Sequence, residues 1–315
     1  MTSGRINTFP ELMAAARSLK KPRMAVAAAG EDTVIASVAH ATREALITPV
    51  LVGVADDIRR IGAQHGLDTG ALDIIDVANP VEACAAAVRL VHEGDAELVM
   101  KGLVSTKEFI RAILHQEFGM RRGRPLSHVA AIESPDQSRF ILMTDSGINI
   151  RPRFNRKIAI LHNALFVAKV LGFAVPKVAV LAAVEKVELP AMPATLDAEL
   201  LRRMGESGKF GDCIIDGPMS MDNVLDSHTA EIKGRTSPVT GKADIIIVPD
   251  IETGNAMYKT IRYLARREIA GFVVGATAPV IVTSRSDSAI TKLYSIALGV
   301  LASRYQSSAK PTSPR

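Results

Sequence analysis

The chain has 315 residues, of which 48% are hydrophobic and 23% charged, and its formal net charge is +5. This length is enough for one large or two medium α/β domains, and the hydrophobic fraction supplies their core. The positive charge is modest, and no basic segment is interleaved with aromatic residues, which argues against a nucleic-acid-binding protein and suits an anionic small-molecule substrate.

The sequence also lacks signals for export or membrane insertion. No run of about 18 apolar residues is present, and the N-terminal sequence MTSGRINTFPELM lacks the apolar core of a signal peptide. Cys84 and Cys213 lie far apart and outside any CxxC pair, as expected of reduced thiols. We therefore expect a cytoplasmic protein that binds no membrane, with a disordered Ser/Pro-rich tail at 307–315.

Strand and helix patterns alternate along the first half of the chain. The predicted strands are 24–29, 49–54, 73–77 and 98–100. The predicted helices are 10–19, 32–46, 58–65, 80–93 and 105–115. Such a βαβα alternation with short loops predicts a parallel sheet with right-handed crossovers. A hairpin follows, with strands at 129–133 and 140–143.

A polar break at 144–149 suggests a domain boundary, and the alternation restarts after it. The predicted strands of this second half are 177–182, 213–215, 245–248, 272–275 and 279–282. The predicted helices are 155–171, 197–205, 255–267 and 290–301, the last with its apolar residues on one face. The sequence therefore predicts an α/β protein of two units.

Polar residues follow five of the predicted strands. They are Lys101, Asp145, Asp216, Asp250 and the pair Ser284-Arg285. Because the carboxyl ends of parallel strands share one edge of a sheet, we expect these residues to line a single cleft. Taken singly, each is as well explained as a turn or cap residue, and only the group of five favours a binding site.

The turn at 283–288, Thr-Ser-Arg-Ser-Asp-Ser, joins the last predicted strand to the last predicted helix. Ser286 or Asp287 is expected to cap this helix, whose free N–H groups favour an anion. Capping does not explain Ser284 and Arg285, which precede it, so the turn is expected to be functional. The basic loop at 119–127, GMRRGRPLS, is either a solvated surface loop or a phosphate-binding segment.

Several common sites are not indicated by the sequence. No Walker A, GxGxxG or GxSxG motif follows a predicted strand, which disfavours P-loop kinases, Rossmann dehydrogenases and α/β-hydrolases. The seven histidines show no HxH or HExxH spacing, so no metal site is predicted, and only His128 lies beside the basic loop. Reasoning from the residues alone ends at an anion-binding α/β protein of two domains.

Longer motifs carry a resemblance to a known family. They are MKGLVSTKEF (100–109), GRPLSHVA (123–130), TDSGIN (144–149), PKVAVLAAVE (176–185), MPATLDA (192–198), DGPMSMDN (216–223), SPVTGKADIIIVPDIETGNAMYK (237–259) and GFVVGATAPVIVTSRSDS (271–288). With them the chain resembles the phosphate acetyltransferase and butyryltransferase family from about residue 24 to 302, and the butyryl branch most.

The resemblance implies a fold and a reaction. The fold is two α/β domains with largely parallel sheets and a cleft between them, similar to isocitrate dehydrogenase. The first domain would comprise 1–147 and 273–315, and the second 148–272. The reaction would convert acyl-CoA and phosphate into acyl phosphate and CoA by direct transfer in a ternary complex. It implies CoA as cosubstrate, no bound cofactor, and a homodimer or higher homo-oligomer.

The resemblance also implies roles for individual residues. Ser284 and Arg285 match the family's catalytic pair. The acetyl branch has an Asp seven residues after this Ser, where Thr291 stands here, so Asp287 is our candidate for the base that deprotonates the CoA thiol. The residues predicted to bind substrate are Lys101, Arg111, Arg124, Ser127, Asp145, Asp216, Asp250 and Thr283.

Other functions stay open at this stage. Acetyl transfer is the alternative within the family, because the acyl chain length cannot be read from the sequence. A non-catalytic protein that senses CoA or an acyl phosphate is the alternative from another class. A metal-dependent dehydrogenase of the same architecture would need a cluster of acidic ligands that the sequence does not show.

Overall fold

The computed structural model describes residues 4–232, 234, 236–284 and 286–308. The described residues fall into two compact units. Unit 1 comprises Met1–Thr8 and Pro125–Arg267, and unit 2 comprises Phe9–Arg124 and Glu268–Arg315. Arg285, the predicted catalytic arginine, lies outside the described residues, and so do residues 309–315, which make up most of the expected disordered tail.

The predicted domain boundaries, 147/148 and 272/273, differ from the divisions between these units. The reason is the hairpin formed by β5 (Ser127–Glu133) and β6 (Phe140–Thr144), which is antiparallel as predicted. Strand β6 also pairs with β9 (Ile245–Ile247). The hydrogen bonds between these strands therefore tie the hairpin to unit 1, whereas the prediction assigned it to the first domain.

Unit 2 contains six neighbouring strands. Their order is β3 (Asp73–Asp76), β2 (Thr48–Gly53), β1 (Arg23–Ala27), β4 (Leu98–Lys101), β11 (Val280–Ile281) and β10 (Ile269–Val274). All neighbours are parallel except β10 and β11, which are antiparallel. Strands β1 and β4 are buried almost throughout, as expected where helices cover a parallel sheet.

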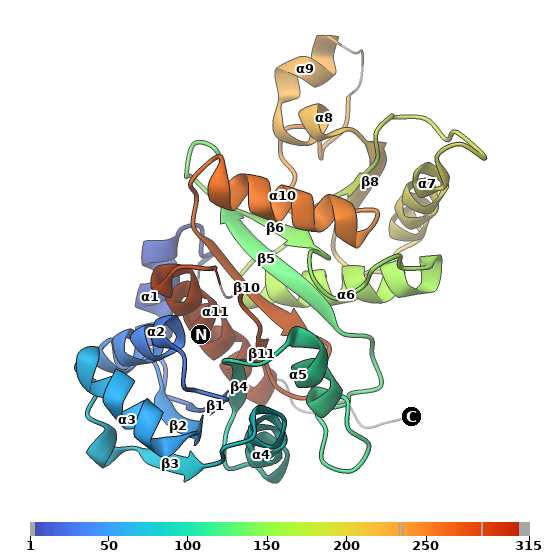
Figure 1. The fold of residues 1–315 in the computed structure, drawn as a ribbon. Coiled ribbons are helices and arrows are strands. Elements are labelled where there is room, and N and C mark those ends of the chain that lie inside the picture. The colour runs from blue at the N-terminus through green and yellow to red at the C-terminus, as the bar shows by residue number, and fades with distance from the viewer. Residues whose placement is uncertain (1–3, 233, 235, 285, 309–315) are drawn as a thin grey trace. The chain divides into compact units, whose positions relative to one another are not determined.

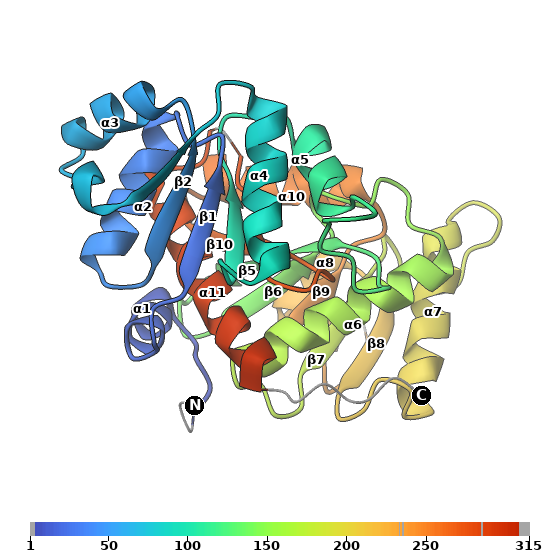
Figure 2. The same ribbon diagram turned by 90° about the horizontal axis from the view of Figure 1, so that it is seen from below.

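The helices of unit 2 form two groups (Figure 2). They are α1 (Phe9–Arg17), α2 (Asp32–Arg43), α3 (Ala55–Gln64), η1 (Thr69–Ala71), α4 (Pro80–Glu93), α5 (Thr106–Ile113) and α11 (Ala289–Ser308). Helix α11 packs on β10 and β4 and against α2 and α1, whereas α4 packs on β1, β2 and β4 and against α5. The apolar stripe predicted for 290–301 therefore faces the core, and Leu293, Ile296 and Ala297 are buried.

The strands of unit 1 follow one another in the order β5, β6, β9, β7 (Lys177–Leu181) and β8 (Ile214–Met219). All pairs except β5–β6 are parallel. Its helices are α6 (Phe154–Val170), α7 (Pro193–Glu206), α8 (Met221–Leu225), α9 (Ser227–Ile232) and α10 (Ile251–Tyr263). Helix α10 lies across β5 and β6 (Figure 1), and side chains from these elements line an apolar pocket.

Two local predictions were wrong. Strand β8 continues to Met219, so Asp216 lies inside it rather than at its end. Helix α11 continues to Ser308, so the first two residues of the expected tail are helical. Within the described residues, no helix combines the length and the apolar character needed to cross a membrane.

Candidate functional site

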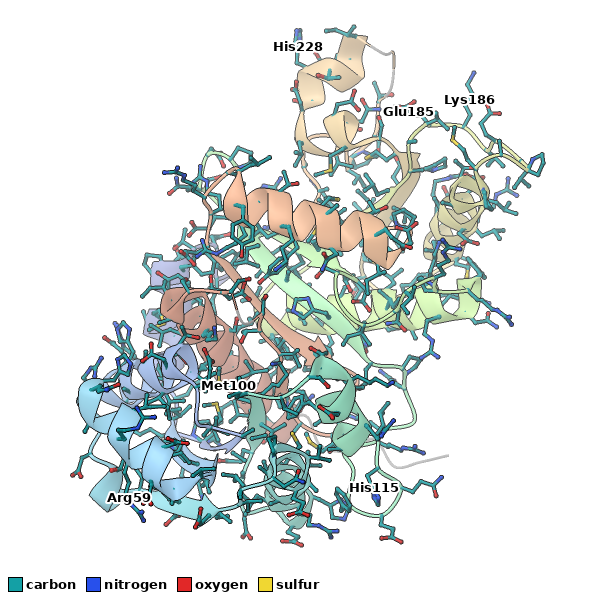
Figure 3. All side chains as sticks on the ribbon, viewed as in Figure 1. Arg59, Met100, His115, Glu185, Lys186 and His228 are labelled. Carbon is teal, nitrogen blue, oxygen red and sulfur yellow. The ribbon has the colours of Figure 1, made fainter. Side chains whose placement is uncertain are left out.

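The ends of β4 and β11 meet at one edge of the unit 2 sheet. The two strands are parallel with Met100 (labelled in Figure 3) opposite Ile281, so the following residues, Lys101 and Val282, lie at the same level. Lys101 is 4% exposed, and its Nζ donates to the carbonyls of Gly102 at 3.1 Å and Val104 at 3.2 Å. The predicted Lys101 thus lies beside the start of the 283–288 turn.

This edge requires a glycine after Lys101. The Gly102 N–H donates to the carbonyl of Ala27 at 2.7 Å, and a Cβ on Gly102 would lie 2.2 Å from the oxygen of Ala28. Such a contact is impossible without moving backbone, so only glycine lets the end of β4 lie directly against the segment after β1.

The 283–288 turn is closed by a carboxylate. Thr283 is buried and Ser284 half-buried. The Ser284 N–H donates to Oδ2 of Asp287 at 2.7 Å, and the Asp287 N–H donates back to the Ser284 carbonyl at 3.1 Å. Because Asp287 is only 1% exposed, its carboxylate acts on the backbone of Ser284 from inside the protein. Ser284 Oγ lies 3.0 Å from Oγ of the exposed Ser286.

The predicted caps of α11, Ser286 and Asp287, were both wrong. The helix begins at Ala289, and Oγ of Ser288 accepts from the Thr291 N–H at 3.1 Å. Ser288 therefore satisfies a free amide of the first helical turn. Since it takes the capping role, the Asp287 carboxylate is released to bind the amide of Ser284.

A buried lysine that the sequence analysis missed lies under the turn. Lys292 is 1% exposed, and its Nζ donates to the carbonyls of Asp287 at 2.7 Å and Ser284 at 3.3 Å. Burial lowers the pKa of Lys292, whereas the nearby charges of Glu31 and Asp287 raise it. The sequence does contain a signal for Lys292, because it lies one helical turn before Ile296 and therefore falls on the predicted apolar face of the helix.

A second missed residue, Glu268, lies at the start of the segment that returns to unit 2. Its Oε2 accepts a hydrogen bond from Oγ of Ser288 at 3.0 Å and another from Oγ1 of Thr291. Thr291 stands where the acetyl branch was expected to have an Asp. The hydroxyl at this position is thus paired with a carboxylate from a distant part of the chain, which no local pattern could have indicated.

The two predicted arginines of unit 2 are exposed. Arg111 lies in the last turn of α5, and Arg124 lies in the basic loop after Gly123, whose φ of 71° is left-handed. Neither guanidinium bonds to another residue of the described part of the chain. By contrast, Nε of Arg121 in the same loop donates to the Leu114 carbonyl at 2.6 Å. Arg111 and Arg124 thus keep donors that can bind an anion.

Ser127 and Asp145, two of the predicted substrate-binding residues, form hydrogen bonds within unit 1. Ser127 is fully buried, and its Oγ accepts from Nδ2 of Asn163 at 2.9 Å. Oδ1 of Asp145 accepts from the N–H groups of His128 at 3.2 Å, Gly147 at 2.9 Å and Ile148 at 3.0 Å. The contacts of Asp145 hold the loop after β6.

Asp216 and Asp250 serve the backbone as well. Oδ1 of Asp216 accepts from the Gly217 N–H at 2.7 Å. Asp250 is the N-cap of α10, and its Oδ1 accepts from the N–H of Thr253 at 2.9 Å and from its Oγ1 at 2.7 Å. The cap interpretation of Asp250 from the sequence is therefore confirmed.

Two further features of unit 1 bear on the chemistry. His128, the histidine beside the basic loop, is buried with Nδ1 2.9 Å from Oγ of Ser146. Oε1 of Glu185 (labelled in Figure 3) accepts from Nδ2 of Asn223 at 2.8 Å and from Oγ of Ser220. Over the described ranges, no three His, Cys, Asp or Glu side chains are grouped as a metal site would need.

The structure thus brings Lys101, Thr283, Ser284 and Asp287 to one sheet edge of unit 2. Arg111 and Arg124 belong to the same unit, on its exposed surface. Ser127, Asp145, Asp216 and Asp250 belong to unit 1. That both groups line a single cleft stays a prediction.

Comparisons with known proteins agree with the resemblance. Residues 78–300 match the family model described as phosphate acetyl/butaryl transferase. A phosphate butyryltransferase of Clostridium acetobutylicum is 41% identical over 296 residues, which cover 94% of this chain and 98% of that protein. A phosphate acetyltransferase of Thermotoga maritima is 40% identical over 282 residues, covering 90% and 95%.

A solved structure shows the same fold. The chain is similar to a branched-chain phosphotransacylase from Enterococcus faecalis V583 with a TM-score of 0.77 and 28% identity. The similarity covers 89% of this chain and 98% of that structure.

Proposed function

This chain belongs to the phosphate acetyl/butyryl transferase family, and we propose that it interconverts a short-chain acyl-CoA plus inorganic phosphate with an acyl phosphate plus CoA. The observation that carries the proposal is the turn after β11, where the sheet edge presents Ser284 and a buried carboxylate, Asp287, fixes its backbone. Such rigid placement of a hydrogen-bond donor is what an acyl-transfer site requires.

The reaction needs charge stabilisation more than a covalent intermediate. When the CoA thiolate attacks an acyl phosphate, a C–S bond forms, the carbonyl C–O bond to phosphate breaks, and phosphate leaves with the bonding electrons. Negative charge develops on the carbonyl oxygen and on the phosphate. We propose that Ser284 donates a hydrogen bond to one of these oxygens and that Arg285 neutralises the charge. The acyl group then passes directly between the two substrates.

The phosphate group is proposed to bind near the cationic residues of unit 2. Arg111 and Arg124 offer exposed guanidinium groups, which bind phosphate through two parallel donors. Lys101 and Thr283 lie at the sheet edge next to Ser284 and complete the proposed set in this unit. For Ser127, Asp145, Asp216 and Asp250 we propose an indirect contribution, because their hydrogen bonds hold the backbone around the strands of unit 1.

Asp287 was our candidate for the base that accepts the CoA thiol proton. Its burial and its bond to the Ser284 amide support a positioning role instead. We propose that Asp287 acts on catalysis chiefly by orienting Ser284, and the two roles are separated by a substitution described in the Discussion.

We further propose that the preferred acyl group is butyryl-like and that CoA acts as cosubstrate, with no bound cofactor. We also propose that the protein is cytoplasmic and forms a homodimer or higher homo-oligomer. The similarity to the Clostridium acetobutylicum enzyme supports the acyl chain, but the acetyltransferase of Thermotoga maritima is nearly as similar. The chain length is therefore a matter for measurement.

The experiment that tests the function is phosphate-dependent release of free CoA thiol by the purified protein. Acetyl-, propionyl-, butyryl- and longer acyl-CoA are offered in turn, each with and without phosphate. We expect release only with phosphate and fastest with butyryl-CoA. If no acyl-CoA of any chain length releases thiol although the protein binds CoA measurably, the protein would instead be identified as a sensor of CoA or acyl phosphate.

A further inference from the structure

We propose that Lys292 is a positioning residue of the acyl-transfer site, which sets the conformation of the Ser284–Asp287 turn by bridging its two end carbonyls. The proposal rests on the proposed function, because it concerns the residue given the central role there. No feature of the reaction assigns a role to Lys292, and it stands eight residues beyond Ser284 on a different element, α11.

The contacts define what the side chain does. The Nζ atom donates to the carbonyl of Asp287 at 2.7 Å and to that of Ser284 at 3.3 Å, so one ammonium group binds both ends of the same turn. An ammonium carries three N–H donors, and its hydrogen bonds to carbonyls are stronger than those of a neutral donor. The carbonyl of Ser284 also accepts from the N–H of Asp287. The position of Ser284 therefore depends on both Lys292 and Asp287.

Burial explains why this arrangement is rigid. Lys292 is 1% exposed and Asp287 is 1% exposed, so water does not compete for their hydrogen bonds. The lysine extends from a helix whose neighbouring Leu293 and Ile296 are packed in the core. The buried charge is balanced nearby by the carboxylates of Asp287 and Glu31, of which Glu31 is fixed as the N-cap of α2.

Simple structural stabilisation does not account for the choice of a lysine. A buried ammonium is costly to desolvate, and replacing a whole buried ion pair by well-packed apolar side chains often leaves a protein equally stable. A buried lysine of unit 1 serves for comparison. Lys157 is 5% exposed and its Nζ lies 2.8 Å from Oδ2 of Asp197, in unit 1 and away from the turn. Lys292, by contrast, binds the backbone of Ser284, a residue proposed to contact the reacting groups.

The test compares Lys292→Met with Lys157→Met in the full-length enzyme. Lys292→Met is expected to lower kcat at least about tenfold while the KM for acyl-CoA changes less than about threefold, because positioning of a transition-state donor affects turnover. Lys157→Met is expected to lower the melting temperature without a comparable loss of kcat. Lys292→Arg, which retains the charge and several donors, is expected to recover part of the lost turnover.

A double-substitution cycle decides whether Lys292 acts through Ser284. If it does, Ser284→Ala with Lys292→Met is no slower than Ser284→Ala alone, because the donor that Lys292 positions is already gone. Fully additive losses, or wild-type kcat in Lys292→Met, would overturn the proposal. Should Lys292→Met fail to fold, the same cycle is run with Lys292→Arg and judged by the same two criteria.

These outcomes are distinct from failure of the proposed function. An inactive wild-type protein would remove the acyltransferase assignment before any variant is considered. An active wild type with an unaffected Lys292→Met would remove only the role of the lysine.

Discussion

The polar residues near the strand ends hold different kinds of backbone in the two units of this protein. In unit 1, the carboxylate of Asp145 accepts from backbone N–H groups of the loop after β6, and that of Asp250 accepts from the first turn of α10. In unit 2, the carboxylate of Asp287 and the ammonium of Lys292 are also bound to backbone, but they hold a turn whose Ser284 side chain stays half-buried at the edge.

The difference shows how scaffold and site can be told apart. A polar side chain at a strand end is explained by structure when the protein itself uses its hydrogen-bonding capacity, as at Asp250. The exposed guanidinium groups of Arg111 and Arg124 are not used by the described part of the protein in this way, so their donors remain available to a ligand. On this criterion we propose that unit 2 carries the reacting groups and that the aspartates of unit 1 support the backbone.

The largest expected effect is that of Ser284→Ala. Removing one preorganised donor to a developing negative charge costs about 10²–10³ in kcat, or roughly 3–4 kcal/mol. We expect this loss in phosphate-dependent thiol release, with CoA affinity measured by calorimetry unchanged. Ser286→Ala is the matched control, because its exposed hydroxyl is the neighbour of Ser284 Oγ. Equal losses in both variants would argue that the hydroxyl pair, rather than Ser284, is what the reaction needs.

Asp145→Ala is expected to lower the free energy of unfolding by about as much as Ser284→Ala lowers transition-state stabilisation. We expect little change in kcat. The substitution leaves the buried N–H of His128 without its acceptor, and likewise the N–H groups of Gly147, Ile148 and Asn149, which are exposed or half-buried. Unsatisfied buried donors cost about 1–3 kcal/mol each before relaxation. Denaturant unfolding measures the loss. A folded Asp145→Ala protein with severely reduced kcat would place this carboxylate in the site and weaken the contrast between the units.

Much of the fold was predictable because local signals agree with it. Helix α4 was predicted at 80–93 and is found at Pro80–Glu93, since Asn79 caps it, Pro80 suits its first turn and Gly94 ends it in a left-handed conformation. Asp216 was misplaced for an equally local reason. The following Gly217-Pro218 is typical of a turn, but here it continues the edge strand β8.

The site was predictable only in part. The resemblance identified the turn with Ser284, and the sequence pattern placed it correctly between a strand and a helix. Glu268 could not be found, because its partner Ser288 is 20 residues away and only folding brings the two together. Lys292 lies in a predicted helix, but its bonds to two carbonyls depend on how the turn curls back over that helix.

Asp287→Asn separates the two roles considered for this residue. The amide oxygen can still accept from the Ser284 N–H, so a positioning role predicts a loss of about 1–2 kcal/mol in transition-state stabilisation as the charge-assisted bond becomes a neutral one. A base for the thiol would lose its function altogether, and kcat would then fall as far as in Ser284→Ala. The kcat of thioester formation from acyl phosphate and CoA, measured across pH, distinguishes these outcomes.

The smallest expected effect is that of Asp250→Ala. Loss of an N-cap costs about 1 kcal/mol of stability, here because the Thr253 N–H loses its acceptor at the start of α10. Catalysis should stay within about twofold of wild type, since in our proposal the residue touches neither substrate. Asp250→Asn is the matched control, because asparagine caps helices as well as aspartate does and should restore the stability. A large fall in kcat that Asp250→Asn does not correct would mean that the negative charge at this strand end is needed for the reaction, and the division between a supporting unit and a reacting unit would have to be abandoned.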